Sequence, residues 1–521
     1  MPEITINQAL QAGLQHHQAG RLSDAAAAYQ QILAHQPDHA DALCLLGVVA
    51  GQTGQHNVAL DLINRSIAGN PDNADAHYHL GNTFRNLSRP LEAIAAYQKS
   101  VLIRPDFAEA WCKLGVTQVD SSRLAPAIES FQRAIAIRPG LAALRITLGN
   151  ALLEKGDLRD SIAAFEQAIA LEPGNCAAYN NLGIALFECG QLEESAAAHR
   201  RAIAIKPDYA DGHHSLSMLS LLLGDFTRGW EKFEWRETGS KRAATGGEDA
   251  TRLWDGGDLT GRTIFIHPEQ GLGDTLQFIR YIPLLAARGP KIMVGCPAPL
   301  RRLLRCINGV DRWLDQGEPI PPFDFRCPLM SLPLKFGTTL ETVPDLGPYV
   351  KPDHADVLRW QNKLAADGGG FKVGLVWAGN PRHRRDRIRS MDLRTMAPLA
   401  QVPGVRFYSL QKGPAADQAK APVPGMNLID HTDELNDFAD TAAMIANLDL
   451  VISVDTSMVH LAGAMAKTVW TLLPFAPDWR WLLGRDDSPW YPTMRLFRQQ
   501  TRGNWDAVIG QVTDALVGIT E

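Results

Sequence analysis

The chain has 521 residues, 45% of them hydrophobic, and a formal net charge of −6 at pH 7. This length predicts more than one domain, and the acidic balance excludes the overall basic field of a nucleic-acid-binding protein. The first residues lack a basic segment followed by an apolar run, and no run of about 18 apolar residues occurs, so we expect no secretory signal and no membrane span. Seven scattered cysteines without a CxxC pair indicate reduced thiols, which favours a cytoplasmic protein.

The first half of the chain repeats with a period of 34 residues. Three kinds of residue keep this period: a proline, the glycine of a Leu-Gly pair and a bulky side chain. They are Pro37, Pro71, Pro105, Pro139, Pro173 and Pro207; Gly47, Gly81, Gly115, Gly149 and Gly183; and Tyr29, Ile63, Tyr97, Phe131, Phe165 and His199. The pattern resembles the tetratricopeptide repeat, a helix–turn–helix unit, and predicts an α-solenoid.

The period has a physical basis. A glycine after leucine lets the two helices of one repeat approach closely, and each proline ends a repeat because it cannot continue the helix. We predict an array over 1–241, made of six repeats and a degenerate seventh. The seventh is rich in aromatic residues, and we expect Trp230, Phe233 and Trp235 to form a cap packed on the next domain.

Such an array forms a superhelix whose concave groove usually holds a protein or peptide, so we expect a protein partner there. Four asparagines near the first helices either bind a peptide backbone or lie on solvated helix faces; they are Asn82, Asn150, Asn180 and Asn181. Two histidine pairs, 77/79 and 213/214, lack acidic or cysteine partners at ligand spacing. We therefore assign them structural roles and predict no metal site.

A polar, glycine-rich segment over 242–253 predicts a linker. Beyond it, short apolar strands alternate with helices, which indicates parallel α/β sheets in two lobes, 254–350 and 371–521, joined by a connection over 351–370. The predicted strands are 264–266, 291–296, 371–380, 405–411, 448–454 and 468–473, and the predicted helices are 274–287, 457–466 and 503–519. A ligand is expected at the carboxyl ends of the strands, in the cleft between the lobes.

The stretch HPEQGLGDTLQFIRY follows the first of these strands. Gly271 and Gly273 fit a dinucleotide fingerprint, but Leu276 stands where its third glycine belongs, and the next strand ends in Cys296 rather than an acid. The pattern therefore argues against NAD or FAD. Asp274 is then either a simple helix cap or a group with a chemical role in the cleft.

Phosphate chemistry is indicated in the second lobe. Asp455, Thr456 and Ser457 stand between a strand and a helix, where free amides and hydroxyls suit a pyrophosphate. An arginine-rich loop over 379–390 and Lys412 at a strand end offer positive charge for a nucleoside diphosphate leaving group. The alternative for the loop is a solvated surface.

Several motifs in this half occur together: QGLGDTLQFIRY, VGLVWAGNPRH followed by DRIRS, SLQKG, VDTSMVHLAGA and PDWRWLLGRDDSPWYP. Their combination resembles the glycosyltransferase module that is fused to tetratricopeptide repeats in many bacterial proteins and is related to the ADP-heptose lipopolysaccharide heptosyltransferases. The resemblance implies a GT-B fold with two Rossmann-like lobes. The layout is similar to that of protein O-GlcNAc transferases and of flagellin glycosyltransferases, whose repeats recruit flagellin.

The resemblance also implies residue roles. Asp274 takes the place of the general base, and Asp455, Thr456 and His460 take places at the donor site. Arg389, with Arg387 beside it, matches a basic residue that contacts the donor phosphate, although the family usually has lysine there and often glycine at the position of Ser457. The predicted donor-binding set is Gly271, Gly273, Asn380, Arg387, Arg389, Gln411, Lys412, Asp455, Thr456, Ser457 and His460.

The expected activity is an inverting, metal-independent transfer of a sugar from a nucleotide-activated donor to a hydroxyl of a protein acceptor recruited by the repeats, with no cofactor. A flagellin-like acceptor fits this expectation. Two alternatives stay open: an envelope-polysaccharide or lipopolysaccharide glycosyltransferase, and a non-catalytic repeat scaffold with a nucleotide-binding module. A homodimer is also left open. The Trp-rich segment 477–492 either packs as core or stacks on a base or sugar.

Overall fold

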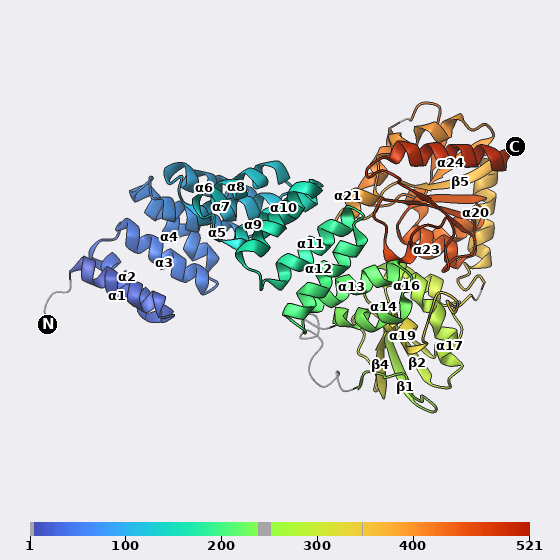
Figure 1. Ribbon diagram of the computed structural model, residues 1–521, viewed down its shortest axis with the longest axis horizontal. Coiled ribbons are helices and arrows are strands. Elements are labelled where there is room, and N and C mark those ends of the chain that lie inside the picture. Colours follow the sequence, from blue (N-terminus) through green and yellow to red (C-terminus); the bar gives the residue numbers. More distant parts are fainter. Residues whose placement is uncertain (1–4, 238–251, 346, 422) are drawn as a thin grey trace. The chain divides into compact units, whose positions relative to one another are not determined.

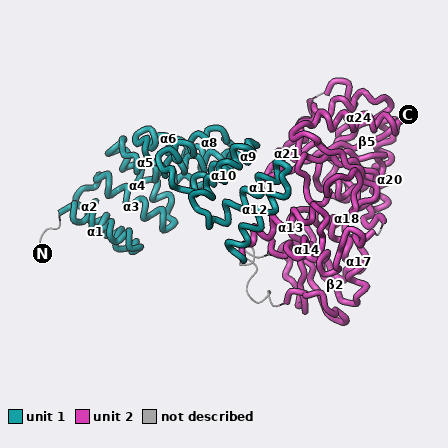
Figure 2. Tube along the Cα trace, in the orientation of Figure 1, with its two compact units in different colours: residues 1–207 teal, residues 208–521 magenta. Residues whose placement is uncertain are grey.

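The computed structural model describes residues 5–237, 252–345, 347–421 and 423–521 (Figure 1). The predicted linker over 242–253 lies outside the described residues except for its last two positions. The chain divides into two compact units, 1–207 and 208–521 (Figure 2). None of the described helices combines the length and the apolar character that crossing a membrane requires.

Unit 1 is a helical solenoid in which consecutive helices pair, two to a repeat. The helices are α1 Ile6–Gln18, α2 Leu22–His35, α3 Ala40–Gln52, α4 His56–Gly69, α5 Ala74–Asn86, α6 Pro90–Ile103, α7 Ala108–Asp120, α8 Leu124–Ile137, α9 Ala142–Lys155, α10 Leu158–Leu171, α11 Cys176–Glu188 and α12 Leu192–Ile205. The periodic prolines follow the second helix of each pair, as the sequence predicts.

The periodic glycine and the periodic bulky residue of each repeat lie against each other. A Cβ atom built on Gly115 would lie 2.6 Å from Cε1 of Phe131, and one on Gly149 would lie 2.5 Å from Cε1 of Phe165. His199 takes the same place beside Gly183, and its Nδ1 lies 3.0 Å from Oδ1 of Asn180. The expected close approach of the two helices is therefore confirmed.

Unit 2 begins with a helical hairpin, α13 Ala210–Leu222 and α14 Phe226–Phe233, followed by a 3-10 turn over Glu234–Glu237. The aromatic side chains of α14 are buried against the α/β part. The ring of Trp230 lies 5.2 Å from that of Trp479 and 6.3 Å from that of Phe278, and its Nε1 donates a hydrogen bond to the Thr338 carbonyl over 3.0 Å. The expected packing on the next domain is therefore seen for Trp230 and Phe233, while Trp235 is half-buried and stacks on His213 of α13 with 4.1 Å between ring centroids.

The first sheet of unit 2 has four parallel strands in the order β3-β2-β1-β4. The strands are β1 Thr263–His267, β2 Lys291–Cys296, β3 Arg312–Asp315 and β4 Phe325–Pro328, and the helices are α16 Leu272–Phe278, α17 Ile282–Ala286, α18 Arg301–Leu304 and α19 Leu332–Lys335. The predicted helix over 274–287 is divided by a 3-10 turn over Ile279–Tyr281. Pro283 is the second residue of the second part, in its first turn, where a missing N–H costs no helical hydrogen bond.

The second sheet has six parallel strands in the order β10-β9-β8-β5-β6-β7. The strands are β5 Phe371–Val376, β6 Val405–Ser409, β7 Leu428–Asp430, β8 Leu450–Val454, β9 Val469–Leu473 and β10 Met494–Arg498, and the helices are α20 His354–Ala366, α21 Asp386–Arg389, α22 Phe438–Ala446, α23 Ser457–Ala464 and α24 Trp505–Thr520. The predicted α/β class with parallel sheets is thus present.

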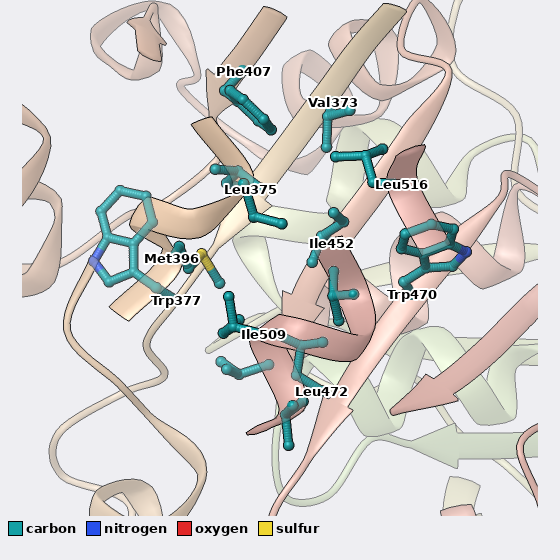
Figure 3. Close-up of a cluster of buried hydrophobic side chains, with 14 of the residues drawn as sticks. Val373, Leu375, Trp377, Met396, Phe407, Ile452, Trp470, Leu472, Ile509 and Leu516 are labelled. Carbon is teal, nitrogen blue, oxygen red and sulfur yellow. The ribbon is translucent and has the colours of Figure 1, made fainter. Parts of the chain in front are cut away.

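The packing around the second sheet explains why the sequences of its central strands are continuous runs of apolar residues. Leu375 of β5, Ile452 of β8 and Leu472 of β9 are fully buried beside Ile509 and Leu516 of α24 (Figure 3). Strands covered on both faces need apolar side chains in both directions. The carboxyl ends of these strands lead into the loops described next.

Candidate functional site

A cavity of about 780 Å³ lies in unit 2 among the segments that follow strands of both sheets. The segment after β1 forms one wall, and the segments after β5, β6, β8 and β9 form the others. The residues from the predicted site that line it are Gly271, Gly273, Asp274, Asn380, Arg389, Gln411, Lys412, Asp455, Thr456, Ser457 and His460. Arg387 is exposed and lies outside this set.

Asp274 lies on the wall that follows β1. The helix α16 begins at Leu272 with Gly271 as its N-cap, so Asp274 is the third residue of the helix and not its cap. Its Oδ2 accepts a hydrogen bond from the Gly271 amide over 2.7 Å, and its Oδ1 pairs with the Arg480 guanidinium. Burial raises the pKa of Asp274, and Arg480 opposes that effect.

Gly273 explains how the two sheets come together at this wall. A Cβ atom on Gly273 would lie 2.8 Å from Cδ2 of His460 and 3.4 Å from the Cα of Ser457. A larger residue would force α16 away from α23. The second glycine of the motif therefore permits close contact between two helices, and this contact places Asp274 near the start of α23.

The start of α23 forms a second wall. Thr456 caps the helix, its Oγ1 accepting from the Met458 amide over 3.3 Å, and Ser457 is the first helical residue. Asp455 precedes the cap, and burial together with the nearby Asp478 raises its pKa to about 6. The free amides of a helix start and the two hydroxyls suit an anionic group such as a phosphate.

His460 is buried one turn into α23. Its Nδ1 lies 2.9 Å from the Tyr491 hydroxyl, and its ring stacks on Trp481 with 5.5 Å between ring centroids. Burial lowers its pKa to about 3, so the ring is neutral at physiological pH. His460 therefore contributes shape and hydrogen bonding to the cavity and no charge.

Basic side chains line the walls after β5 and β6. Arg389 is half-buried, and its Nε donates to Oδ1 of Asp386 over 3.3 Å. Lys412 donates from Nζ to the Thr432 carbonyl over 2.6 Å. Arg385 also lines the cavity, a residue of the arginine-rich loop that sequence reasoning did not single out. The predicted gathering of positive charge at these strand ends is therefore present.

Gln411 lines the cavity with its amide turned to the backbone. Its Oε1 accepts from the amides of Trp377 and Ala378 over 3.0 and 2.9 Å, and its Nε2 donates to the carbonyls of Ala378 and Lys412 over 2.9 Å each. These four bonds use the hydrogen-bonding capacity of the amide. Gln411 thus ties the ends of β5 and β6 together and shapes the wall.

Sequence reasoning missed two further charged residues of the cavity, Asp478 and Arg480. Both belong to the Trp-rich segment after β9. Three tryptophans and a tyrosine of this segment are buried and do not line the cavity, so in the structure they pack as core; they are Trp479, Trp481, Trp490 and Tyr491. The signal available in the sequence was the alternation of charged and aromatic residues in Asp478-Trp479-Arg480-Trp481.

The described residues contain no group of three or more His, Cys, Asp or Glu side chains arranged to hold a metal ion. His77 in unit 1 is engaged with backbone, its Nε2 lying 2.9 Å from the Pro71 carbonyl oxygen. All four asparagines considered above also have hydrogen-bond partners, and Asn181 donates from Nδ2 to Oδ1 of Asn150 over 3.0 Å. Asn82 accepts from the Tyr97 hydroxyl over 2.7 Å, and Asn180 meets His199.

Comparison with known proteins identifies the helical half of the chain. A family model described as tetratricopeptide repeat matches residues 10–74, 45–106, 78–142 and 146–210. The chain contains tetratricopeptide repeats. Protein FlbA of Caulobacter vibrioides is 29% identical in an alignment of 319 residues that covers 57% of this chain and 53% of that protein. The chain thus spans about half the length of this curated relative.

Solved structures that resemble the chain cover parts of it. The crystal structure of MamA is 26% identical, covers 32% of this chain and 96% of its own, and has a TM-score of 0.31. YrrB, described as a TPR protein with an unusual peptide-binding site, is 20% identical, with coverages of 36% and 98% and a TM-score of 0.34. The structure of pilF from Pseudomonas aeruginosa is 16% identical, covers 40% of this chain and 95% of its own, and has a TM-score of 0.36.

Proposed function

We propose that unit 2 is a glycosyltransferase of the GT-B type, which moves a sugar from a nucleotide-activated donor to a hydroxyl of a protein acceptor. One observation carries the proposal. A carboxylate of raised pKa, Asp274, shares a single cavity with the start of α23 and with the basic residues Arg389 and Lys412. A base on one side and an anion-binding surface on the other are what sugar transfer from a nucleoside diphosphate requires.

The reaction follows from this arrangement. Asp274 accepts the proton of the acceptor hydroxyl while the acceptor oxygen bonds to the anomeric carbon of the sugar. The bond between that carbon and the phosphate oxygen breaks, and its electron pair leaves with the nucleoside diphosphate. Arg389, Lys412 and the amides that begin α23 stabilise the negative charge that develops on the phosphate. A displacement of this kind inverts the anomeric centre.

We retain the expectation of metal-independent chemistry because cationic side chains and a helix start already face the leaving group. The repeats support a protein acceptor, since such arrays are protein-binding modules, and a flagellin-like protein is one acceptor that the proposal allows. On this proposal the repeats bind the acceptor protein in their concave groove, and Asp274 accepts the proton of its hydroxyl.

Asp274→Asn tests the proposal directly. Calorimetric titration with UDP, GDP, ADP, TDP and CMP first identifies the nucleotide that binds, and release of that nucleotide from the matching sugar donor then measures turnover. Loss of a general base costs about 10²–10⁴-fold in rate, so we expect D274N to lose turnover by this factor and to keep its nucleotide affinity.

Asp487→Asn is the matched control, because Asp487 pairs with Arg485 and does not line the cavity. We expect its turnover to equal that of the parent chain. Normal turnover in D274N would show that the base lies elsewhere. Absence of nucleotide binding in the parent would favour the non-catalytic scaffold.

A further inference from the structure

Arg480 lies in the segment after β9 and reaches α16, which follows β1 of the other sheet. Its Nη2 pairs with Oδ1 of Asp274, and its Nε donates to Oε1 of Gln277 over 2.6 Å. Its Nη1 donates to Oδ1 of Asp478 over 2.8 Å. Asp274 and Gln277 lie about one turn apart on α16, and the guanidinium reaches them from two different nitrogen atoms of its planar fork, a geometry that a lysine ammonium lacks.

The guanidinium is fixed by its surroundings. Arg480 is 7% exposed, and its Cζ lies 4.4 Å from the ring centre of Trp479 and 5.8 Å from that of Phe278. Trp479 is in turn packed against Trp230 of α14. A side chain packed against two aromatic rings has little rotational freedom to lose on making its hydrogen bonds. The position of the charge therefore follows from the fold.

Among the other groups around Asp274, the Gly271 amide also stabilises the charged carboxylate, while two neighbouring carboxylates disfavour it. Asp478 and Glu269 both raise the pKa of Asp274, as does burial, and the Gly271 amide acts with Arg480 in lowering it. His460 faces α16 from α23, but it is neutral. The Asp274 side chain keeps 17% exposure, and each of its oxygens has one hydrogen bond described above. A lone pair on each oxygen remains for an acceptor proton.

We propose that Arg480 is a positioning residue for Asp274, holding its carboxylate in the charged form and in one orientation toward the cavity. This inference rests on the proposed function, in which Asp274 is the base. Arg480 touches no reacting atom in this scheme. It acts through the carboxylate that it pairs with and through Gln277, which anchors the same helix.

The Gly271 amide provides a reporter that needs no substrate, because it donates to Oδ2 of Asp274. Its resonance in a ¹⁵N-glycine-labelled chain should follow the protonation of the carboxylate, and D274N identifies that resonance by abolishing its titration. We expect the titration to move to higher pH in Arg480→Met, and to move less in Arg480→Lys, which keeps the charge but not the fork. Arg485→Met, whose arginine pairs with Asp487, should leave it unchanged.

The outcomes separate the two proposals. An unchanged titration in a folded R480M chain overturns the role of Arg480, and where R480M is not recovered folded, an unchanged titration in R480K does so. A displaced titration in a chain that binds none of the nucleotides supports the role of Arg480 while the proposed function fails. The pH profile of donor turnover, where turnover is seen, should have its acidic limb displaced in the same direction as the amide.

Discussion

Single glycines decide how closely the helices of a repeat approach. Gly51 and Gly115 lie in α3 and α7, and alanine at either position would gain the same helix propensity. Their surroundings differ. A Cβ atom on Gly51 would lie 3.8 Å from the Cβ of Ala59, an ordinary contact, while one on Gly115 would lie 2.6 Å from the ring of Phe131.

The pair gives a matched prediction. Gly51→Ala should stabilise the chain by up to about 1 kcal/mol. Gly115→Ala should lose that gain to overpacking, which costs about 1–3 kcal/mol in a well-packed core. Urea unfolding followed by far-ultraviolet circular dichroism measures both. Equal stabilities of the two variants would show that the helices separate freely and that the glycine is not needed for packing.

His199 predicts a pH dependence of stability. It is buried, and burial lowers its pKa from 6.5 to about 4. The unfolded chain therefore takes up the proton first as the pH falls. The free energy of unfolding is therefore highest above about pH 6.5, where His199 is neutral in both states, and it falls as the pH drops toward 4. The part of this decrease that is due to His199 is about 3 kcal/mol at most.

His199→Phe tests this prediction, since Phe131 and Phe165 take the same place in other repeats. The free energy of unfolding of the parent should fall more steeply between pH 7 and pH 4 than that of H199F. Chemical unfolding at a series of pH values measures the two slopes. Parallel slopes would mean that His199 is protonated in the folded chain without cost.

The site residues show which roles follow from local sequence. Gly271, Gly273 and Asp274 are adjacent to a strand and open a helix, so their place at a strand end could be predicted. The pairing of Asp274 with Arg480 could not, because the two residues are 206 positions apart. Likewise, Gln411 was predicted to bind the donor, but the structure shows its amide engaged with the backbone.

Among the helices, α14 is the member of the α13–α14 hairpin whose aromatic residues pack on the α/β part of unit 2. Its buried residues Phe226, Trp230 and Phe233 share one face. This face packs on Trp479, the neighbour of Arg480, and on Phe278 of α16. The helix therefore supports both elements that form the Asp274–Arg480 pair.

Trp230→Ala should disturb those elements in particular. Removing a buried tryptophan costs about 3–5 kcal/mol. Hydrogen exchange followed by mass spectrometry should show faster exchange in α16 and in residues 479–491, and unchanged exchange in α3 to α10. Trp111→Ala in α7 is the control, because that residue is only half-buried and lies in unit 1. Similar exchange in both variants at residues 479–491 would contradict the supporting role.

Some elements were predictable and others were not. The strands β5, β8 and β9 are buried apolar runs, which the sequence shows directly. β4 lies within a proline-rich stretch and pairs with β1, and no local sequence pattern predicts this strand or its pairing. β3, β7 and β10 are short or carry charged residues, and their pairing decides that they are strands.

For the chain as a whole, the structure divides at Pro207, so the hairpin α13–α14 belongs to the same unit as the two sheets. Besides the aromatic contacts, Arg236 is buried and pairs with Glu269, just before the loop that leads to Asp274. A fragment that begins after this hairpin would expose the apolar face of the α/β part and leave Glu269 without this partner.

Two fragments test this division. Residues 208–521 should unfold cooperatively, while residues 254–521 should bind the dye ANS and unfold without a sharp transition, because exposed apolar surface and loss of the Arg236–Glu269 pair both destabilise. Circular dichroism melts and limited proteolysis provide the measurement. Cooperative unfolding of 254–521 at the same temperature would show that the hairpin is dispensable for the fold.

The sequence by itself determined the repeat array and the α/β class, since both depend on patterns within a few tens of residues. A glycine and its aromatic partner lie in one repeat, and a buried parallel strand is apolar along its own length. Only the tertiary structure decided which residues share the cavity and how they are charged. The pairing of Asp274 with Arg480 and the neutral state of His460 depend on burial and on contacts between distant segments, because desolvation and ion pairing act through space.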